Sequence, residues 1–213
     1  MKEKKQIVEE VYEILKKRII NLNYIPGQLF YEADIANEFG LNKTQVKKIF
    51  KKLQDKKLIN VIPRYGCQVA PIDFRYMKSV YEVLREIEGY TTRLAALRMP
   101  EEKISELTAI VERIKNYHMK TDYKAMMLDN KKFHTILLQS NGNSCFFDIF
   151  LDLYMHTERL WFYTQNNFTD ISFFYDTLAN TLEAIKERNA LKAETCAKEH
   201  INGFVKLIKQ ELL

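Results

Sequence analysis

One stretch near the N-terminus, residues 31–70, constrains the fold of this chain more than any other. Its first part predicts a short helix over residues 32–39 with one apolar face. Gly40 ends this helix, because glycine reaches positive φ without strain. Asn42 is a good N-cap for a second helix that begins at Lys43. A short helix, a turn that contains glycine and a second helix together make the helix-turn-helix pattern.

The second helix has an apolar stripe and a basic face. The stripe consists of Val46, Ile49, Phe50 and Leu53. The opposite face carries Lys43, Thr44, Gln45, Lys47, Lys48, Lys51 and Lys52. Two short β-branched runs, residues 58–62 and 67–70, follow this helix and are joined by Pro63-Arg64-Tyr65-Gly66, which predicts a hairpin. A hairpin directly after the second helix is a wing, so we expect a winged helix-turn-helix.

A helix of this width fits the major groove of double-stranded DNA. Lysines on its exposed face and an arginine at the tip of the wing supply the cations that displace phosphate counterions. A basic face on an isolated helix is more often simply solvated, but the turn, the cap and the wing all favour DNA binding. The predicted DNA-binding residues are Lys43, Thr44, Gln45, Lys47, Lys48, Arg64, Tyr65 and Gly66.

The net charge of +5 is unevenly distributed. Residues 1–72 carry 14 Lys and Arg against 8 Asp and Glu, whereas the remaining residues carry 19 against 20. The charge that suits a polyanion therefore lies in the N-terminal third. Three widely spaced cysteines without a C-x-x-C motif indicate reduced thiols, and no apolar run approaches the ~20 residues of a membrane span. We expect a cytoplasmic protein that does not bind membranes.

The chain has only six glycines and four prolines, which favours long helices. A first amphipathic helix over residues 4–22 is expected to support the helix-turn-helix. After the wing, the pattern predicts six helices with short breaks: residues 74–98, 100–118, 122–139, 144–165, 170–188 and 190–212. The predicted fold is mainly α: a winged helix-turn-helix domain over residues 1–72 with a small β-hairpin wing, and an all-α antiparallel helical bundle over residues 73–213.

Taken together, these features resemble the GntR family of bacterial transcription regulators, in the FadR-like branch with an all-helical (FCD-type) effector domain. The N-terminal resemblance covers residues 22–70 and includes Pro26-Gly27 and Phe39-Gly40-Leu41. Two arginines of the family pattern are lysines here, Lys43 and Lys47, and its proline is Gln45. Arginine can read guanine in a bidentate way, whereas lysine is a compact, mobile point charge, so the operator preference of relatives cannot be transferred. Gln45 could contact adenine, or it could be an ordinary surface position of the helix.

The C-terminal resemblance rests on Tyr81…Arg85…Glu88, on Phe133-His134 followed by residues 140–143, and on Ala197…His200. Many members of the branch hold a divalent metal with one aspartate and three histidines. The corresponding positions here are Asn130, His134, Leu178 and His200. This ligand set is incomplete, so at most a weakly bound zinc, nickel or manganese ion is expected. The alternative is that the two histidines form a hydrogen-bonded pair inside the bundle.

The resemblance also suggests that Arg85 faces an effector pocket together with His134 and His200. An arginine there could clamp a small carboxylate by paired hydrogen bonds. Arg85 could instead pair with Glu88 or Glu82, or lie in solvent. Asp129 neighbours the candidate metal position, but one residue turns it by about 100° around the helix, away from the face of His134.

The resulting hypothesis is a homodimeric transcription regulator that binds a double-stranded operator and responds to a small organic acid or sugar acid. A repressor is expected, although the sign of regulation depends on where the operator lies relative to the promoter. One alternative is a constitutive DNA-binding dimer with a vestigial pocket. A metal-dependent enzyme on the helical bundle is less well supported, because the sequence contains no nucleophile–base pair and the ligand set is depleted. We therefore do not expect an enzyme.

Overall fold

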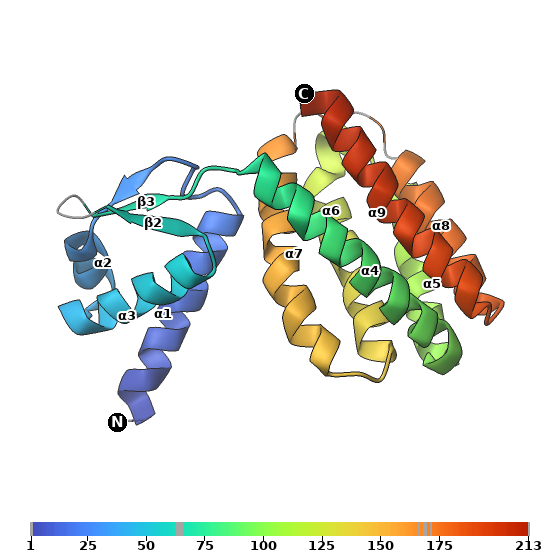
Figure 1. Ribbon diagram of the computed structural model, residues 1–213, viewed down its shortest axis with the longest axis horizontal. Coiled ribbons are helices and arrows are strands. Elements are labelled where there is room, and N and C mark those ends of the chain that lie inside the picture. The colour runs from blue at the N-terminus through green and yellow to red at the C-terminus, as the bar shows by residue number, and fades with distance from the viewer. Residues whose placement is uncertain (1, 63–65, 166, 168–169, 171, 213) are drawn as a thin grey trace. The chain divides into compact units, whose positions relative to one another are not determined.

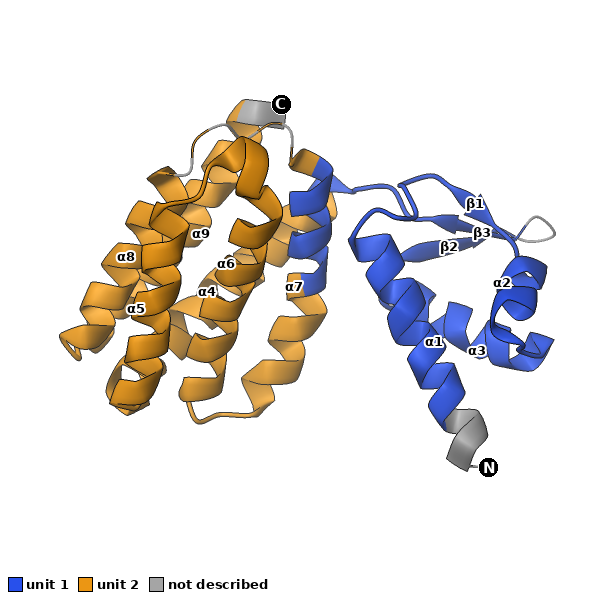
Figure 2. Ribbon diagram, turned by 180° about the vertical axis from the view of Figure 1, so that it is seen from behind, with its two compact units in different colours: residues 1–74, 155–163 blue, residues 75–154, 164–213 orange. Residues whose placement is uncertain are grey.

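The computed structural model describes residues 2–62, 66–165, 167, 170 and 172–212. Within these ranges the chain forms nine helices and one three-stranded sheet (Figure 1), which confirms the mainly α prediction. The chain divides into two compact units (Figure 2). The first contains residues 1–74 and 155–163, and the second contains residues 75–154 and 164–213. The domain boundary between residues 72 and 73 stays a prediction.

The first unit contains the predicted helix-turn-helix. Its helices are α1 (Lys2–Ile20), α2 (Glu32–Phe39) and α3 (Lys43–Asp55). Gly40 ends α2 in the left-handed conformation, at φ 63° and ψ 34°. The next residue, Leu41, is buried and donates its backbone N–H to Ala36. The turn therefore forms as the sequence predicts, because a positive-φ glycine and a buried anchor follow one another.

The sheet has the strand order β1 (Leu29–Phe30), β3 (Gly66–Val69), β2 (Ile59–Ile62), and all pairs are antiparallel. Strands β2 and β3 form the predicted hairpin, and β1 is a third strand that the sequence did not predict. Gly66 has a φ of +114°, and a Cβ atom there would lie 2.9 Å from the backbone oxygen of Phe30. Glycine is therefore required at the start of β3, where β1 pairs alongside it.

The core of the first unit joins α1, α3 and the sheet. It includes Val11, Leu15 and Ile19 from α1, Val46, Ile49, Phe50 and Leu53 from α3, and Phe30, Ile59, Cys67 and Val69 from the strands. Burial raises the pKa of the Cys67 thiol to about 12, so this cysteine is an inert core residue. The amphipathic pattern of α1 and α3 thus determines which face of α3 stays exposed.

The second unit is a helical bundle. Its helices are α4 (Phe74–Arg98), α5 (Glu101–Lys115), α6 (Met119–Ser140), α7 (Cys145–Thr164), α8 (Ser172–Lys186) and α9 (Ala190–Leu212). Helix α8 packs on α9 and α5, and α5 packs on α6. Residues 155–163 of α7 cluster with the first unit. Among the described residues, no helix has the length and apolar character needed to cross a membrane.

Candidate functional site: a basic helix face and a buried histidine cavity

A reciprocal pair of hydrogen bonds holds the N-terminus of α3. The side-chain oxygen of Asn42 accepts from the backbone N–H of Gln45, and the side-chain oxygen of Gln45 accepts from the backbone N–H of Asn42, each at 3.0 Å. This capping box satisfies two backbone donors that the start of a helix would otherwise leave unpaired. Gln45 therefore has a structural role, whatever its part in reading DNA.

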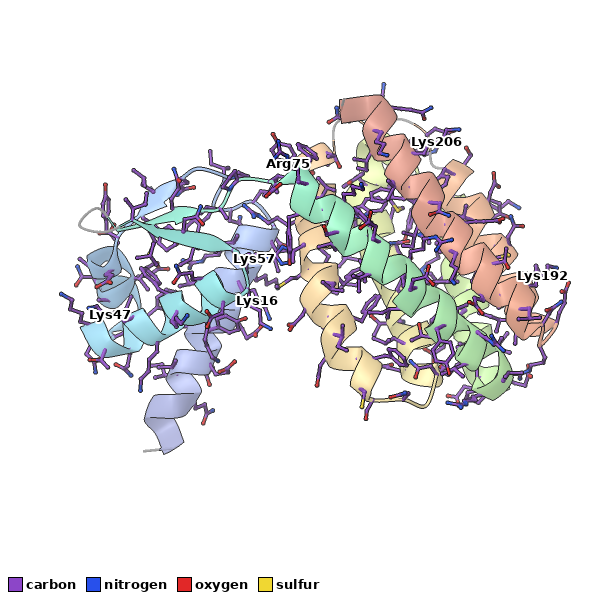
Figure 3. The ribbon with its side chains drawn as sticks, viewed as in Figure 1. Lys16, Lys47, Lys57, Arg75, Lys192 and Lys206 are labelled. Atoms are coloured by element: carbon purple, nitrogen blue, oxygen red, sulfur yellow. The ribbon has the colours of Figure 1, made fainter. Side chains whose placement is uncertain are left out.

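The first half of α3 carries lysines that no carboxylate among the described residues neutralises. Lys43, Lys47 and Lys48 lie on the exposed face together with Thr44, and Figure 3 labels Lys47 in this half of the helix. Within the part of the chain that the structure describes, none of these three lysines has a carboxylate partner. Their charge is available to an anion that approaches this face.

The second half of α3 differs, because carboxylates hold its two lysines. The Lys51 Nζ atom lies 2.6 Å from Asp55 Oδ1. Lys52 pairs with Glu9 of α1, and its Nζ atom lies 4.7 Å from the centre of the Tyr12 ring. Free positive charge is therefore concentrated in the N-terminal half, which is the half that contacts base edges in helix-turn-helix proteins.

The exposed face of α3 borders a hollow of about 1220 Å³ on the surface of the first unit. It is lined by Val8, Glu9, Asn42, Lys43, Thr44, Gln45, Lys47, Lys48, Lys51 and Lys52. Five predicted DNA-binding residues therefore share one concave surface. Of the three wing residues, Arg64 and Tyr65 lie outside the described residues. Gly66 begins β3, where its role is explained by backbone geometry.

A second candidate site lies inside the helical bundle. A cavity there is lined by Glu88 from α4, Phe133, His134 and Leu137 from α6, Leu178 and Thr181 from α8, and Ala197 and His200 from α9. Its volume is about 10 Å³, which is room for about one water molecule. The structure thus brings together the two histidines that the sequence singled out, in a cavity smaller than an organic acid.

His200 is buried and neutral. Burial, reinforced by the neighbouring His134, lowers the pKa of His200 from 6.5 to about 3. Its Nδ1 atom lies 2.7 Å from the Thr177 hydroxyl, and that hydroxyl donates to the Phe173 carbonyl at 2.7 Å. Since the hydroxyl has only one hydrogen, we assign the proton of His200 to Nδ1 and the lone pair to Nε2.

His134 has a different neighbour, the buried carboxylate of Glu88. The His134 Nδ1 atom lies 2.8 Å from Glu88 Oε2. The direction of approach does not meet hydrogen-bond geometry, so we describe the pair as an electrostatic contact. The centres of the His134 and His200 rings are 5.3 Å apart. The Nδ1 atom of each ring contacts another group, and the alternative of a hydrogen-bonded histidine pair stays a prediction.

The remaining predicted metal positions do not complete a metal site. Asn130 donates from Nδ2 to the Tyr154 hydroxyl at 3.3 Å and does not line the cavity, and Leu178 presents only carbon atoms to it. Across the described residues, no group of three or more His, Cys, Asp or Glu side chains is placed to hold a metal ion. Two imidazoles are too few ligands for a structural or catalytic zinc site. The residues present do not fit a metal.

Asp129 does not supply the missing ligand. Burial favours its neutral form, but hydrogen bonds from Arg113 and Tyr117 outweigh this and lower the pKa of the Asp129 carboxyl. The Arg113 guanidinium holds both carboxylate oxygens, at 2.8 and 2.7 Å. The predicted rotation away from His134 is confirmed, since both partners of Asp129 belong to α5 and the segment that follows it.

Arg85 lies half-exposed on α4 and does not line the cavity. Its guanidinium pairs with Glu86 and donates from Nε to Asn202 Oδ1 at 3.1 Å. The internal partners that we considered, Glu88 and Glu82, are therefore wrong. A role for Arg85 in effector binding stays a prediction.

Sequence reasoning missed Glu88 as a cavity residue. A signal was available, because Glu88 follows Val80 and Leu84 at four-residue steps on the buried face of α4. An acidic side chain on such a face needs a partner. The sequence alone could not identify that partner, since His134 comes from a different helix.

Two family models match the chain. Residues 7–69 match the bacterial regulatory proteins of the gntR family, and residues 79–203 match the FCD domain. The chain is similar to the HTH-type transcriptional repressor RspR of Escherichia coli (strain K12), with 21% identity over 204 residues, which are 95% of this chain and 89% of RspR. It is also similar to the galactonate operon transcriptional repressor of the same strain, with 27% identity over 61% of this chain and 64% of that protein.

The HTH-type transcriptional regulator YdhC of Bacillus subtilis (strain 168) is 24% identical over 63% of this chain, and the match covers 60% of YdhC. Among solved structures, E. coli McbR/YncC has a TM-score of 0.79 at 16% identity, with 97% of this chain and 99% of that chain covered. The likeness to McbR/YncC shows a shared fold.

The chain therefore belongs to the GntR family of bacterial regulators, in the branch that carries a helical FCD domain. It is a transcriptional regulator and not an enzyme.

Proposed function

We propose that this regulator is a repressor that binds a double-stranded operator as a homodimer, through the first half of α3 and the wing. The supporting observation is that Lys43, Lys47 and Lys48 have no carboxylate partner in the described part of the chain, on a helix whose start is fixed by a capping box. Phosphates of the operator would supply the missing counter-charge. Repression is supported by the two similar E. coli proteins that are named repressors.

A fluorescence anisotropy titration tests this function. DNA from upstream of the protein's own gene is compared with scrambled DNA of equal length, at low and moderate salt. Salt-sensitive binding that prefers the upstream DNA is expected, and Lys47→Ala should weaken it. Lys124→Ala, which removes an exposed lysine of α6, is the charge-matched control. Equal weakening by both variants would count against a specific role for α3.

We further propose that a small organic acid or sugar acid acts in the helical bundle, at the cavity that contains Glu88, His134 and His200. Buried polar groups from α4, α6 and α9 converge there in an otherwise apolar interior. A cavity of about 10 Å³ must open to admit such a ligand. Arg85 would have to exchange Glu86 and Asn202 for the ligand carboxylate.

A second candidate is a constitutive repressor whose cavity stays closed. It is favoured by the small volume and by Glu88, whose carboxylate would repel an acid. A thermal-shift panel of organic acids, neutral sugars and amines separates the two, since a ligand at 100 times its Kd stabilises the folded state by about 2.7 kcal/mol. The effector hypothesis expects a shift that His134→Gln removes. A panel without any shift supports the constitutive repressor.

A further inference from the structure

The side-chain amide of Gln45 has one atom that is engaged and one that is free. Its Oε1 atom accepts the backbone N–H of Asn42 at 3.0 Å, as part of the capping box. Because a backbone N–H needs an acceptor, this bond assigns the oxygen and nitrogen ends of the amide. Among the described residues, no group is hydrogen-bonded to the Gln45 Nε2 atom. Gln45 therefore has two N–H donors available to a ligand.

The amide is held in a fixed position on α3. Gln45 is the third residue of the helix, and its backbone N–H donates to Asn42 Oδ1 at 3.0 Å. Val46, the next residue, is fully buried in the core of the first unit. Gln45 itself is half-exposed and lines the hollow beside α3. Since the first residues of such a helix contact base edges, the amide is oriented before DNA arrives.

A glutamine that is free to rotate reads adenine by a pair of hydrogen bonds. Its oxygen accepts from the adenine N6 group while its NH2 group donates to N7. Both ends of the amide must then face the same base edge. In this structure the oxygen of Gln45 faces the backbone of Asn42 instead. Turning it toward a base would leave a backbone donor at the start of α3 without its partner, so adenine reading competes with the capping box.

We propose that Gln45 is a specificity-determining residue that selects guanine over adenine, with its oxygen kept in the capping box and its NH2 group donating to the base. Guanine presents two adjacent acceptors, N7 and O6, in the major groove. Adenine places a donor beside its single acceptor, and cytosine presents a donor. The inference rests on the proposed function, because it requires the first half of α3 to contact base edges.

The side chains around Gln45 favour the same base. Lys43, Lys47 and Lys48 are exposed and can only donate, and the exposed Thr44 hydroxyl can donate as well as accept. Residues 43–48 contain no aspartate or glutamate that could accept from a cytosine or adenine amino group. A surface that consists mainly of donors is complementary to base edges that consist of acceptors, and guanine has such an edge.

Selection of binding sites from a random DNA pool tests the proposal with wild type, Gln45→Glu and Gln45→Ala. Glutamate has the shape of glutamine and keeps a capping oxygen, but it replaces the donors by an acceptor. Wild type should prefer guanine over adenine by about five-fold or more at one position of each half-site. Gln45→Glu should shift that position to cytosine, whose N4 group donates, and Gln45→Ala should accept any base there. An adenine preference in wild type, or an unchanged preference in Gln45→Glu, would overturn the proposal.

Two controls separate base reading from charge and from folding. Asn42→Asp adds the same negative charge and keeps the oxygen that accepts the Gln45 N–H, so it should weaken binding to all sequences and leave the preferred bases unchanged. Hydrogen exchange of residues 43–55 should stay at the wild-type rate in Gln45→Glu, because the capping box is retained. A shift to cytosine in Asn42→Asp as well would refute the role of Gln45.

The same selection distinguishes failure of this inference from failure of the proposed function. A wild-type protein that enriches no sequence from the pool would refute recognition of an operator, and the role of Gln45 with it. A wild-type protein that enriches a defined sequence, at which neither Gln45 variant changes any base preference, would refute the role of Gln45 alone.

Discussion

The capping box of α3 gives the sharpest prediction about how the sequence positions the basic face. Asn42→Ala removes the oxygen that accepts the Gln45 N–H at 3.0 Å, at a helix start whose residues are exposed. Loss of an N-cap of this type costs about 1 kcal/mol, within a range of about 0.5–2. Asn42→Ser restores an accepting oxygen and should recover most of that loss.

Hydrogen exchange followed by mass spectrometry measures this locally. A cost of about 1 kcal/mol corresponds to about five-fold faster exchange through opening of α3. Peptides that cover residues 43–55 should show the change in Asn42→Ala and show little of it in Asn42→Ser. Peptides from α8, in the other unit, provide an internal reference. The role of the cap would be refuted if α3 of Asn42→Ala exchanged at the wild-type rate, or if Asn42→Ala and Asn42→Ser accelerated exchange equally.

Two further predictions concern His200 and Gly66. Burial lowers the pKa of His200 to about 3, whereas the histidine of the unfolded chain has a pKa of 6.5. Below pH 6.5 the unfolded chain therefore takes up a proton that the folded chain does not. Stability should fall as the pH drops below 6.5, by at most about 2 kcal/mol at pH 5. Urea unfolding should show that His200→Asn loses this dependence while His118→Asn, at an exposed histidine, keeps it, and a wild-type dependence in both would contradict the assignment. Gly66→Ala should lower stability by about 1–3 kcal/mol, because residue 66 has a positive φ and its Cβ atom would lie 2.9 Å from the backbone oxygen of Phe30. Gly27→Ala, which has positive φ but open space, should cost less in the same thermal melt, and equal costs would remove the steric argument.

The helix-turn-helix could be predicted closely because its signals are local. Helix α2 has the predicted bounds, and α3 begins at the predicted residue, because Gly40 and Asn42 determine the helix ends that lie next to them in the sequence. Strand β1 could not be predicted in this way. A strand of two residues is too short to show an alternating pattern, and Leu29–Phe30 is a strand only because it pairs with β3.

The break between α5 and α6 shows how a local signal can be misplaced. The sequence predicts helix ends at residues 118 and 122, with Asp122 opening the next helix, but α6 begins at Met119 and His118 is its N-cap. Asp122 instead accepts from the His118 backbone N–H at 2.8 Å, which resembles the reach of an acidic side chain back to the N-cap in a capping box. An aspartate serves either position, so the sequence alone could not decide.

The candidate sites divide in the same way. The exposed face of α3 follows from one helical period, so its lysines could be placed from the sequence. The contact between Glu88 and His134 and the bond between His200 and Thr177 each join different helices. Their formation depends on how the bundle packs, and periodicity carries no information about that.

The salt dependence of operator binding tests the central claim most directly, that the uncompensated lysines of α3 bind the phosphates of DNA. Wild type, Lys47→Ala and Lys51→Ala differ by one lysine each, but Lys51 is already neutralised by Asp55. Each lost phosphate contact should lower the slope of log K against log salt by about 0.9, or about 1.8 for the two copies in a dimer. We predict this decrease for Lys47→Ala and a wild-type slope for Lys51→Ala. Equal slopes for Lys47→Ala and wild type would contradict the account.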